Sequence, residues 1–351
     1  MIAMTRYCIN GRFLTRSTTG VDRFARELVS ELDKIVQPGE VEIAVPGGHE
    51  IIARPFLESI EIKEVGTITG HLWEQTQFSS YLRKTGQTGI NLCNTAPIAN
   101  PGIVCIHDMA ASAHPEFYKG KGLWRKVRLH FVTTKAKAIL TVSEFSRGEI
   151  LKYYPKTKAP VEVVYDAWQH VRNVEPDGES LSRYGLKEGE YFFALSSLTK
   201  NKNLIWTVKT ALANPDYLFA VAGGINTKIF GDIDIPEAEN VKYLGYVTDE
   251  EAKALMAGCK AFLFPSFYEG FGIPPLEAMA NGAKVVVSDI EVLHEVYGES
   301  AIYIDPNVPA KNLCELVSES VVEAPDKALS KFSWERSAQK LYSVMNEIRV
   351  R

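Results

Sequence analysis

The sequence predicts an α/β protein built from two domains, each a parallel sheet with helical crossovers. Short apolar runs alternate along the chain with longer segments of helical period, which is typical of that architecture. The length of 351 residues is large for a single hydrophobic core. Both patterns lapse between Asp166 and Pro176, so we place the boundary there. The expected division is 1–168, 169–333 and a terminal helix at 334–351.

The elements follow in order from this alternation. In the first domain we expect strands at 6–10, 41–46, 60–65, 90–93, 103–107, 138–142 and 161–165, with helices at 21–32, 72–83, 123–137 and 144–153. In the second we expect strands at 191–196, 218–222, 241–246, 261–264, 284–288 and 301–304, with helices at 204–212, 249–257, 276–280 and 311–321. A last helix begins near Ser333 and runs to 348.

Composition excludes several classes of protein. Hydrophobic residues make up 46% and charged residues 23%, the values of a soluble globular chain. A net charge of -4 argues against a nucleic-acid partner. The start MIAMTRYCIN lacks the apolar core of a secretory signal, and the five cysteines are scattered, which is typical of buried thiols in a reducing compartment. We therefore expect a cytoplasmic protein.

The most informative stretch is FPSFYEGFGIPPLEAMANG, from Phe264 to Gly282. It leaves a buried strand, carries Glu269 and two glycines in a loop, and enters a helix at a proline pair that precedes Glu277. A helix start at the carboxyl end of a strand attracts anions, and two nearby carboxylates fit that anion only if they bind hydroxyl groups. A nucleotide sugar has this chemistry. Taken singly, each Glu is more often a solvated side chain.

This stretch resembles the donor site of the group 1 retaining glycosyltransferases of GT-B fold, a bacterial family with a Glu-x7-Glu motif. The resemblance implies two Rossmann-like domains facing across a cleft, and a final helix that packs back towards the first domain. It implies that Glu269 and the amides of Phe271 and Gly272 hold the sugar, and that Glu277 binds the ribose. Neighbouring Gly270 and Ile273 belong to the same loop. Retention and independence of metal ions also come only from the resemblance.

Other donor positions are carried over in the same way. Lys202 matches the lysine that binds the diphosphate, while Asn201 stands where relatives have an arginine. The resemblance adds a base-binding edge at Tyr246 and Val247. Glycine or small residues near the phosphates complete the expected set: Ser197 and Gly223. A lysine-rich turn is ordinarily just solvated, so Lys202 depends on the match.

Two residues of the first domain join the prediction. Gly20 opens a helix after the first strand, and the family places backbone amides there near the diphosphate; a plain loop glycine is equally compatible with the spacing. His107 ends a buried strand, and the resemblance places a histidine beside the reacting sugar, although a lone histidine is more often structural. We expect His107, Glu269 and Lys202 to be catalytic.

A basic stretch without acidic residues runs from Phe117 to Ser143. On a helix, Leu123, Val127 and Phe131 would lie on one side and the basic residues on the other: Lys121, Arg125, Arg128 and Lys135. Such a face suits an anionic membrane surface or a lipid-linked acceptor. An ordinary solvated face is equally compatible with the pattern.

The resemblance as a whole implies transfer of a hexose, mannose or glucose, from a GDP- or UDP-linked sugar to a glycan or lipid-linked glycan in surface polysaccharide synthesis. The alternatives are an epimerase or phosphorylase of the same architecture, and a non-catalytic partner that only binds nucleotide sugar. A nicotinamide-dependent dehydrogenase is weaker, because Gly-x-Gly-x-x-Gly follows no predicted strand. The pair Asp232 and Asp234 lies in a Gly/Pro-bounded loop, and we expect no metal and no other cofactor.

Overall fold

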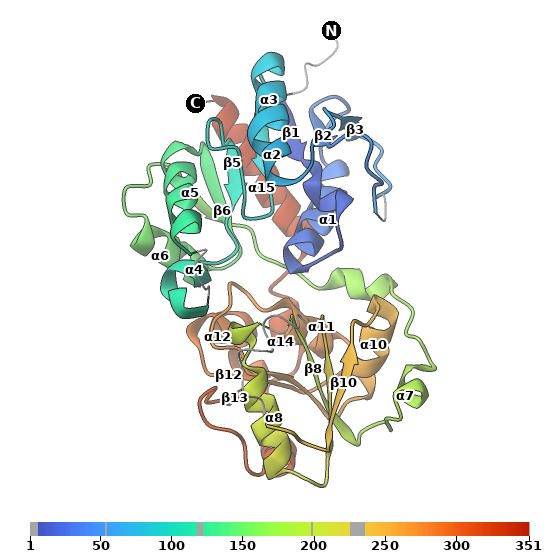
Figure 1. The fold of residues 1–351 in the computed structure, drawn as a ribbon. Helices are drawn as coiled ribbons and strands as arrows, with labels where there is room; N and C mark the ends of the chain where they lie inside the picture. Colours follow the sequence, from blue (N-terminus) through green and yellow to red (C-terminus); the bar gives the residue numbers. More distant parts are fainter. Residues whose placement is uncertain (1–5, 53–54, 118–121, 198, 225–235, 351) are drawn as a thin grey trace. The chain divides into compact units, whose positions relative to one another are not determined.

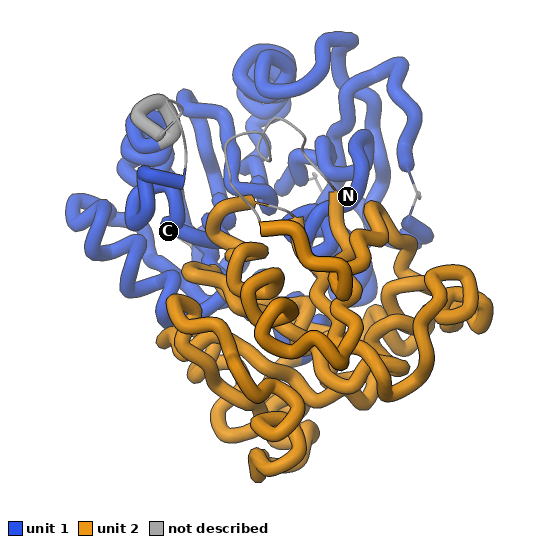
Figure 2. The backbone as a smooth tube through the Cα atoms, turned by 60° about the horizontal axis from the view of Figure 1, so that its bottom comes forward, with its two compact units in different colours: residues 1–166, 333–351 blue, residues 167–332 orange. Residues whose placement is uncertain are grey.

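The computed structural model describes residues 6–52, 55–117, 122–197, 199–224 and 236–350, with the backbone alone for 122–125 and 350. The chain forms two compact units (Figure 2). Unit 1 comprises residues 1–166 and 333–351, and unit 2 comprises residues 167–332. The chain thus crosses between the units at 166/167 and 332/333.

Unit 1 is built on a seven-stranded parallel sheet of order β3-β2-β1-β4-β5-β6-β7 (Figure 1). Its strands are β1 (Tyr7–Asn10), β2 (Val41–Val45), β3 (Glu61–Glu64), β4 (Thr88–Asn91), β5 (Ile103–Cys105), β6 (Ala138–Thr141) and β7 (Val161–Val163). Its helices are α1 (Gly20–Asp33), α2 (Gly70–Trp73), α3 (Ser79–Thr85), α4 (Ala110–Ala113), α5 (Gly122–Lys135), α6 (Glu144–Tyr153) and α15 (Trp334–Val350).

Unit 2 contains a six-stranded parallel sheet of order β10-β9-β8-β11-β12-β13. Its strands are β8 (Tyr191–Leu195), β9 (Leu218–Ala222), β10 (Val241–Gly245), β11 (Ala261–Phe264), β12 (Val285–Ser288) and β13 (Ile302–Ile304). Its helices are α7 (Ser180–Arg183), α8 (Leu204–Ala213), α10 (Asp249–Gly258), α11 (Ile273–Ala280), α12 (Glu291–Tyr297), α13 (Leu313–Glu319) and α14 (Asp326–Leu329). The two parallel sheets confirm the predicted fold class.

Each sheet reverses its strand order once, and ligands of such sheets bind at the carboxyl ends of the strands at that point. The reversal lies between β1 and β4 in unit 1 and between β8 and β11 in unit 2. These two positions, called the switch points below, contain most of the residues selected from the sequence.

The closing helix α15 completes unit 1 although it lies at the other end of the chain. Its first residue, Trp334, packs edge-on against Phe24 of α1 with ring centroids 6.0 Å apart. Near its end, the Tyr7 hydroxyl of β1 donates a hydrogen bond to the Met345 carbonyl. The first strand and the last helix are therefore parts of one core.

Two helices differ from the prediction. The segment expected at 72–83 is interrupted by a π-helical turn, Glu74–Phe78, which turns Glu74 into the interior with no exposed surface. In α5, Val127 and Phe131 are 40% and 43% exposed, and Leu129 and Val132 are the buried residues. The apolar side chains of Val127 and Phe131 are thus on an exposed part of α5.

Candidate functional site

The loop after β11 and the start of α11 form the centre of the unit 2 switch point. Gly272 caps α11 with φ 98° and ψ 64°, in the left-handed region. A Cβ at that position would lie 2.9 Å from Leu293 Cδ2, and the Tyr297 hydroxyl donates to the Gly272 carbonyl. The helix has prolines in its first turn and no side-chain cap. Since Pro274 and Pro275 have no N–H, the donors that remain for a ligand at this helix start are the N–H groups of Gly272 and Ile273.

Lys202 and Glu269 lie together at this switch point. Lys202 ends the short turn after β8, and its ammonium nitrogen lies 2.6 Å from Glu269 Oε1. Both side chains are mostly buried, at 19% and 10% exposure, and the ammonium also lies 5.3 Å from the centre of the Phe264 ring. The structure thus brings together two of the three predicted catalytic residues, a cation suited to phosphate and a carboxylate suited to hydroxyl groups.

The two loops that carry this ion pair are fastened to each other. Asn203 adopts a left-handed conformation (φ 55°) and donates to the carbonyls of Pro265 and Pro306 at 3.0 and 2.7 Å. The backbone N–H of Phe267 donates to the Asn201 carbonyl at 2.8 Å. These bonds fix the position of Lys202 against the loop of Glu269, so the pair is preorganised.

Glu277, on the second turn of α11, has a partner that sequence reasoning missed. His170 Nε2 lies 2.7 Å from Glu277 Oε1, and the two side chains are 6% and 17% exposed. His170 comes from the segment 166–176, which we interpreted only as a domain boundary. Its spacing gave no signal, because the two residues are more than a hundred positions apart in the chain.

The remaining donor positions of unit 2 differ in character. Gly223 has φ 139°, and a Cβ there would meet the Ser196 carbonyl oxygen at 1.8 Å, so the close approach is to the chain's own backbone. Tyr246 is 76% exposed whereas Val247 is buried, and Ser197 is exposed. Only Tyr246 among these presents a large side chain to solvent.

In unit 1 the start of α1 is already occupied by a carboxylate. Asp22 accepts hydrogen bonds from the N–H and hydroxyl of Thr19 at 3.1 and 2.6 Å, and from Arg16 Nε at 2.7 Å. Gly20 is the first helical residue, and a Cβ there would meet no atom within 4 Å. The backbone of unit 1 alone therefore does not require glycine at this position.

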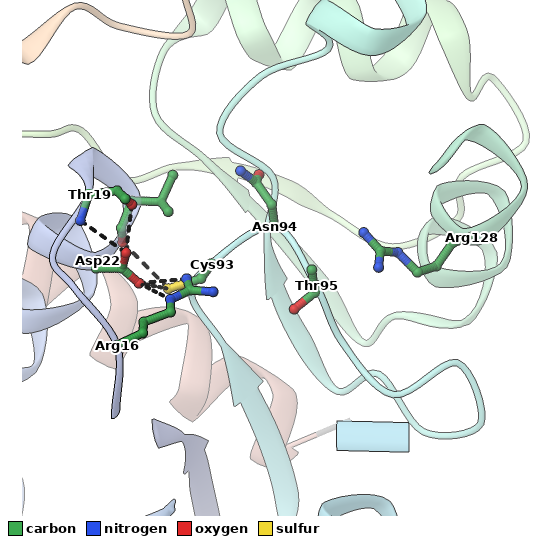
Figure 3. A pocket seen from close by; sticks show the side chains of 8 residues that line it. Arg16, Thr19, Asp22, Cys93, Asn94, Thr95 and Arg128 are labelled. Atoms are coloured by element: carbon green, nitrogen blue, oxygen red, sulfur yellow. Dashed lines mark hydrogen bonds and ion pairs between the residues drawn. The ribbon is translucent and has the colours of Figure 1, made fainter. Parts of the chain in front are cut away.

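A pocket of about 360 Å³ opens at the same switch point (Figure 3). It is lined by side chains from the loop before α1, from α1, from the loop after β4 and from α5: Arg16, Thr19, Val21, Asp22, Cys93, Asn94, Thr95 and Arg128. Figure 3 shows Arg128 reaching towards it from α5. From the sequence we expected Arg128 on a basic helix face and did not select the others, although Asn94 follows the end of a predicted strand.

His107 lies beside this pocket through Asn94. Its backbone N–H donates to Asn94 Oδ1 at 2.7 Å, and its Nε2 lies 2.8 Å from the Leu92 carbonyl. Since a carbonyl only accepts, Nε2 carries a proton. The side chain is buried against the edge of Phe24, and burial lowers the pKa of His107 below its ordinary value. The imidazole is therefore neutral at pH 7.

Under the same sheet edge, Glu74 is the centre of a polar network. Its carboxylate accepts from Arg12 at 2.8 Å, from Thr95 at 2.6 Å and from Asn10 at 3.1 Å. Burial alone would raise the pKa of Glu74, but the hydrogen bonds and the charge of Arg12 outweigh it and lower the pKa to about 2. Because the Thr95 hydroxyl donates to this buried carboxylate, the side chain of Thr95 is held in place and one wall of the pocket is rigid.

Within residues 6–350, leaving out the gaps given above, no three His, Cys, Asp or Glu side chains gather as a metal site. Asp232 and Asp234 lie outside the described residues, as does Lys121, and the side chain of Arg125 is not described. The expected independence of metal ions stays a prediction. No helix in the described ranges is long and apolar enough to cross a membrane.

Comparison with known proteins first identifies the fold. The chain is similar to the sucrose-phosphate synthase of Thermosynechococcus elongatus, with a TM-score of 0.74, 13% sequence identity and 99% of both chains covered. Two Rossmann-like parallel sheets in this arrangement of strands define the GT-B architecture expected from the sequence.

Sequence comparison then identifies the family. A family model described as "Glycosyl transferases group 1" matches residues 181–328. The chain is 31% identical over 254 residues to the O-antigen chain mannosyltransferase B of Escherichia coli, covering 66% of this chain and 67% of that protein. It is 28% identical over 246 residues to the O-antigen chain mannosyltransferase RfbU of Salmonella typhimurium, covering 68% and 66%. The chain belongs to the group 1 glycosyltransferases, and it is an enzyme of that class.

Proposed function

We propose that the protein transfers a mannosyl residue from a nucleoside-diphosphate mannose to a growing O-antigen-type glycan, with retention of configuration. The observation that carries the proposal is the Lys202–Glu269 ion pair beside the uncapped start of α11. Mannose and the O-antigen acceptor are taken from the two similar enzymes, both described as O-antigen chain mannosyltransferases. GDP is the first nucleoside diphosphate to test and UDP the second.

Stabilisation of the leaving group is the main catalytic effect in this mechanism. When the bond between sugar and diphosphate breaks, negative charge develops on the diphosphate. The ammonium of Lys202 and the free N–H groups of α11 counter that charge in a partly buried site, where such contacts are strong. Glu269, held beside Lys202, accepts hydrogen bonds from the sugar hydroxyls, which orients the anomeric carbon.

Retention follows in this proposal from attack of the acceptor hydroxyl on the face that the diphosphate leaves. Glu269 is held by Lys202 and is assigned to binding, so no covalent intermediate on it is invoked. Neutral His107 has a nitrogen that accepts a hydrogen bond, and we assign it to a sugar hydroxyl. The departing diphosphate takes the proton of the acceptor.

The unit 1 pocket is the proposed binding site for the acceptor sugar. Hydroxyls, a carboxylate and guanidinium groups line it, and these groups form the hydrogen bonds that carbohydrates need. Its volume of about 360 Å³ accommodates a sugar residue. The hydrogen bond from Thr95 to Glu74 fixes one wall of the pocket.

Peripheral contact with an anionic membrane is also proposed, through the exposed face of α5. Val127 and Phe131 are exposed there, and the Lys135 ammonium lies 5.7 Å from the centre of the Phe131 ring. Apolar side chains flanked by lysines suit the interface of an anionic bilayer. Flotation with phosphatidylglycerol vesicles tests this contact: Phe131→Ser should weaken binding, and equal binding of the variant would contradict it.

The decisive experiment is a transfer assay with EDTA present, using GDP-mannose, UDP-glucose and a lipid-linked or synthetic glycan acceptor. We expect a mannosylated product from GDP-mannose with the anomeric configuration of the donor, read by NMR. Release of free or epimerised sugar without an acceptor would favour the epimerase alternative. Binding of the donor without any turnover would favour the non-catalytic partner.

A further inference from the structure

We propose that His170 is a positioning residue for the donor nucleoside, holding the carboxylate of Glu277 in the orientation that binds the ribose. The inference rests on the proposed function and on the ribose-binding role that the family resemblance implies for Glu277. It adds a residue that lies outside the motif of Glu269 and Glu277, at the crossing between the two units.

The geometry of the pair is that of a strong, directed hydrogen bond. His170 Nε2 lies 2.7 Å from Glu277 Oε1. An ionised carboxylate only accepts, so Nε2 carries the proton and donates it. The imidazole is 6% exposed and the carboxylate 17% exposed, so water competes poorly for the bond. Oε1 is thereby engaged and the carboxylate plane is fixed, which leaves Oε2 as the oxygen for the ribose.

The imidazole is itself held on a rigid support. His170 lies in the turn Gln169–Asn173. On one side of it, Trp168 Nε1 donates to the Leu329 carbonyl and Gln169 Nε2 to the Phe332 carbonyl, each at 2.9 Å. These bonds join the two crossing segments of the chain to each other. A side chain on such a support can select one rotamer of Glu277.

Without this bond, Glu277 would be a partly buried carboxylate free to rotate about its terminal torsion. Rotation spreads the oxygens over many orientations, so binding of the ribose would have to order them. The expected loss is specific to the hydroxyl groups, because phosphate binding at Lys202 and the start of α11 does not involve Glu277. That specificity separates a positioning role from a general structural role.

The test compares GDP with 2′,3′-dideoxy-GDP, and UDP with its dideoxy analogue, by titration calorimetry on the full chain. The wild-type protein should bind the ribonucleotide about tenfold or more tightly than the dideoxy form. His170→Ala should reduce that ratio towards one while the dideoxy affinity stays nearly unchanged. His170→Gln, whose amide also donates, should restore part of the ratio.

Unit 2 supplies a matched control. His294 Nε2 lies 2.6 Å from Asp289 Oδ1, but these side chains are 47% and 65% exposed. His294→Ala should leave the ribose preference unchanged. Thermal unfolding of each variant verifies the fold, and His170→Asn, which keeps a polar side chain but is too short to reach, serves if His170→Ala does not fold.

The outcomes separate this inference from the proposed function. Two results would overturn the role of His170 and leave the proposed function standing. One is a ribose preference in His170→Ala as large as in the wild type. The other is an equal loss of affinity for the ribonucleotide and for its dideoxy form. The role of His170 would also be overturned if the wild-type protein bound the ribonucleotide and its dideoxy form equally well. If the wild-type protein binds neither GDP nor UDP, the proposed function fails and this inference fails with it.

Discussion

The two switch points of the molecule use the same sheet topology and differ in what occupies the helix that follows. In unit 1 the start of α1 is taken by the carboxylate of Asp22, with Arg16 against it. In unit 2 the start of α11 has no side-chain cap, and the nearby cation is Lys202. Unit 1 thus presents a polar wall whose groups are already paired and which suits neutral hydroxyl groups. Unit 2 presents an uncapped helix start beside the Lys202–Glu269 ion pair, which suits a ligand that carries both phosphates and hydroxyl groups.

The largest expected effect comes from removing the cation of unit 2. Lys202→Ala should lower kcat/KM by about 10² to 10³-fold, because stabilisation of the departing diphosphate is lost. Steady-state kinetics on the transfer reaction measure it. Lys209→Ala, an exposed lysine on α8, is the control and should be silent. Undiminished turnover in Lys202→Ala would remove the asymmetry between the two switch points.

The second prediction concerns pH and the wall of unit 1. The pKa of Glu74 is about 2 in the folded protein against an ordinary 4.5. A lowered pKa stabilises the fold above pH 4.5, and that contribution is lost as the pH falls from about 4.5 towards 2. It amounts to on the order of 3 kcal/mol.

Chemical unfolding measured between pH 6 and pH 3 checks this dependence. Glu74→Gln should flatten the acid limb, and its stability at pH 6 should be lower than that of the wild type. An acid limb that is equally steep in Glu74→Gln would assign the dependence to other carboxylates.

A pair of glycine substitutions sharpens the comparison further. Gly272→Ala should destabilise unit 2 by about 1–3 kcal/mol, since φ is 98° and Leu293 crowds the added methyl group. Gly20→Ala meets open space and should fold as well as the wild type, while its activity should fall if a ligand approaches that backbone. Melting curves and turnover measured together distinguish the two. Normal stability of Gly272→Ala would contradict the strain at the start of α11.

The smallest effect is expected at the cap of α1. Asp22→Asn removes the charge while keeping a similar shape, and should cost about 1 kcal/mol of stability. It also makes the start of α1 more like that of α11, so inorganic phosphate should bind unit 1 more tightly than in the wild type. Phosphate titration by NMR is the measurement, and unchanged phosphate affinity would show that Asp22 does not set the difference between the two switch points.

Much of the fold was predictable because parallel strands are continuous apolar runs. The ranges predicted for β9 and β11 agree with the structure at both ends. The π-helical turn at Glu74 was not predictable, since it depends on a carboxylate whose partners Asn10, Arg12 and Thr95 are distant from it in the chain. The exposure of Val127 and Phe131 on α5 was also not predictable, because both are apolar and only the tertiary contacts decide which face of a helix is buried.

The site was predictable where it is local in sequence. Glu269, Gly272 and Glu277 share one motif, and Lys202 was placed by resemblance; their roles remain proposals. His170 and Asn94 could not be found in that way, because each acts through a hydrogen bond to a residue distant in the chain. Such hydrogen bonds between separate segments form only in the folded chain.

The place of α15 in unit 1 has a consequence for biosynthesis. Unit 2 is one continuous segment, whereas unit 1 needs its last nineteen residues, 333–351, to bury Phe24 beneath Trp334 and to pair Tyr7 with Met345. A ribosome delivers those residues only after the whole of unit 2, so unit 1 is begun before unit 2 and completed after it. Until then part of the core of unit 1 stays uncovered, and a chain truncated after residue 332 would contain all of unit 2 but leave unit 1 without α15.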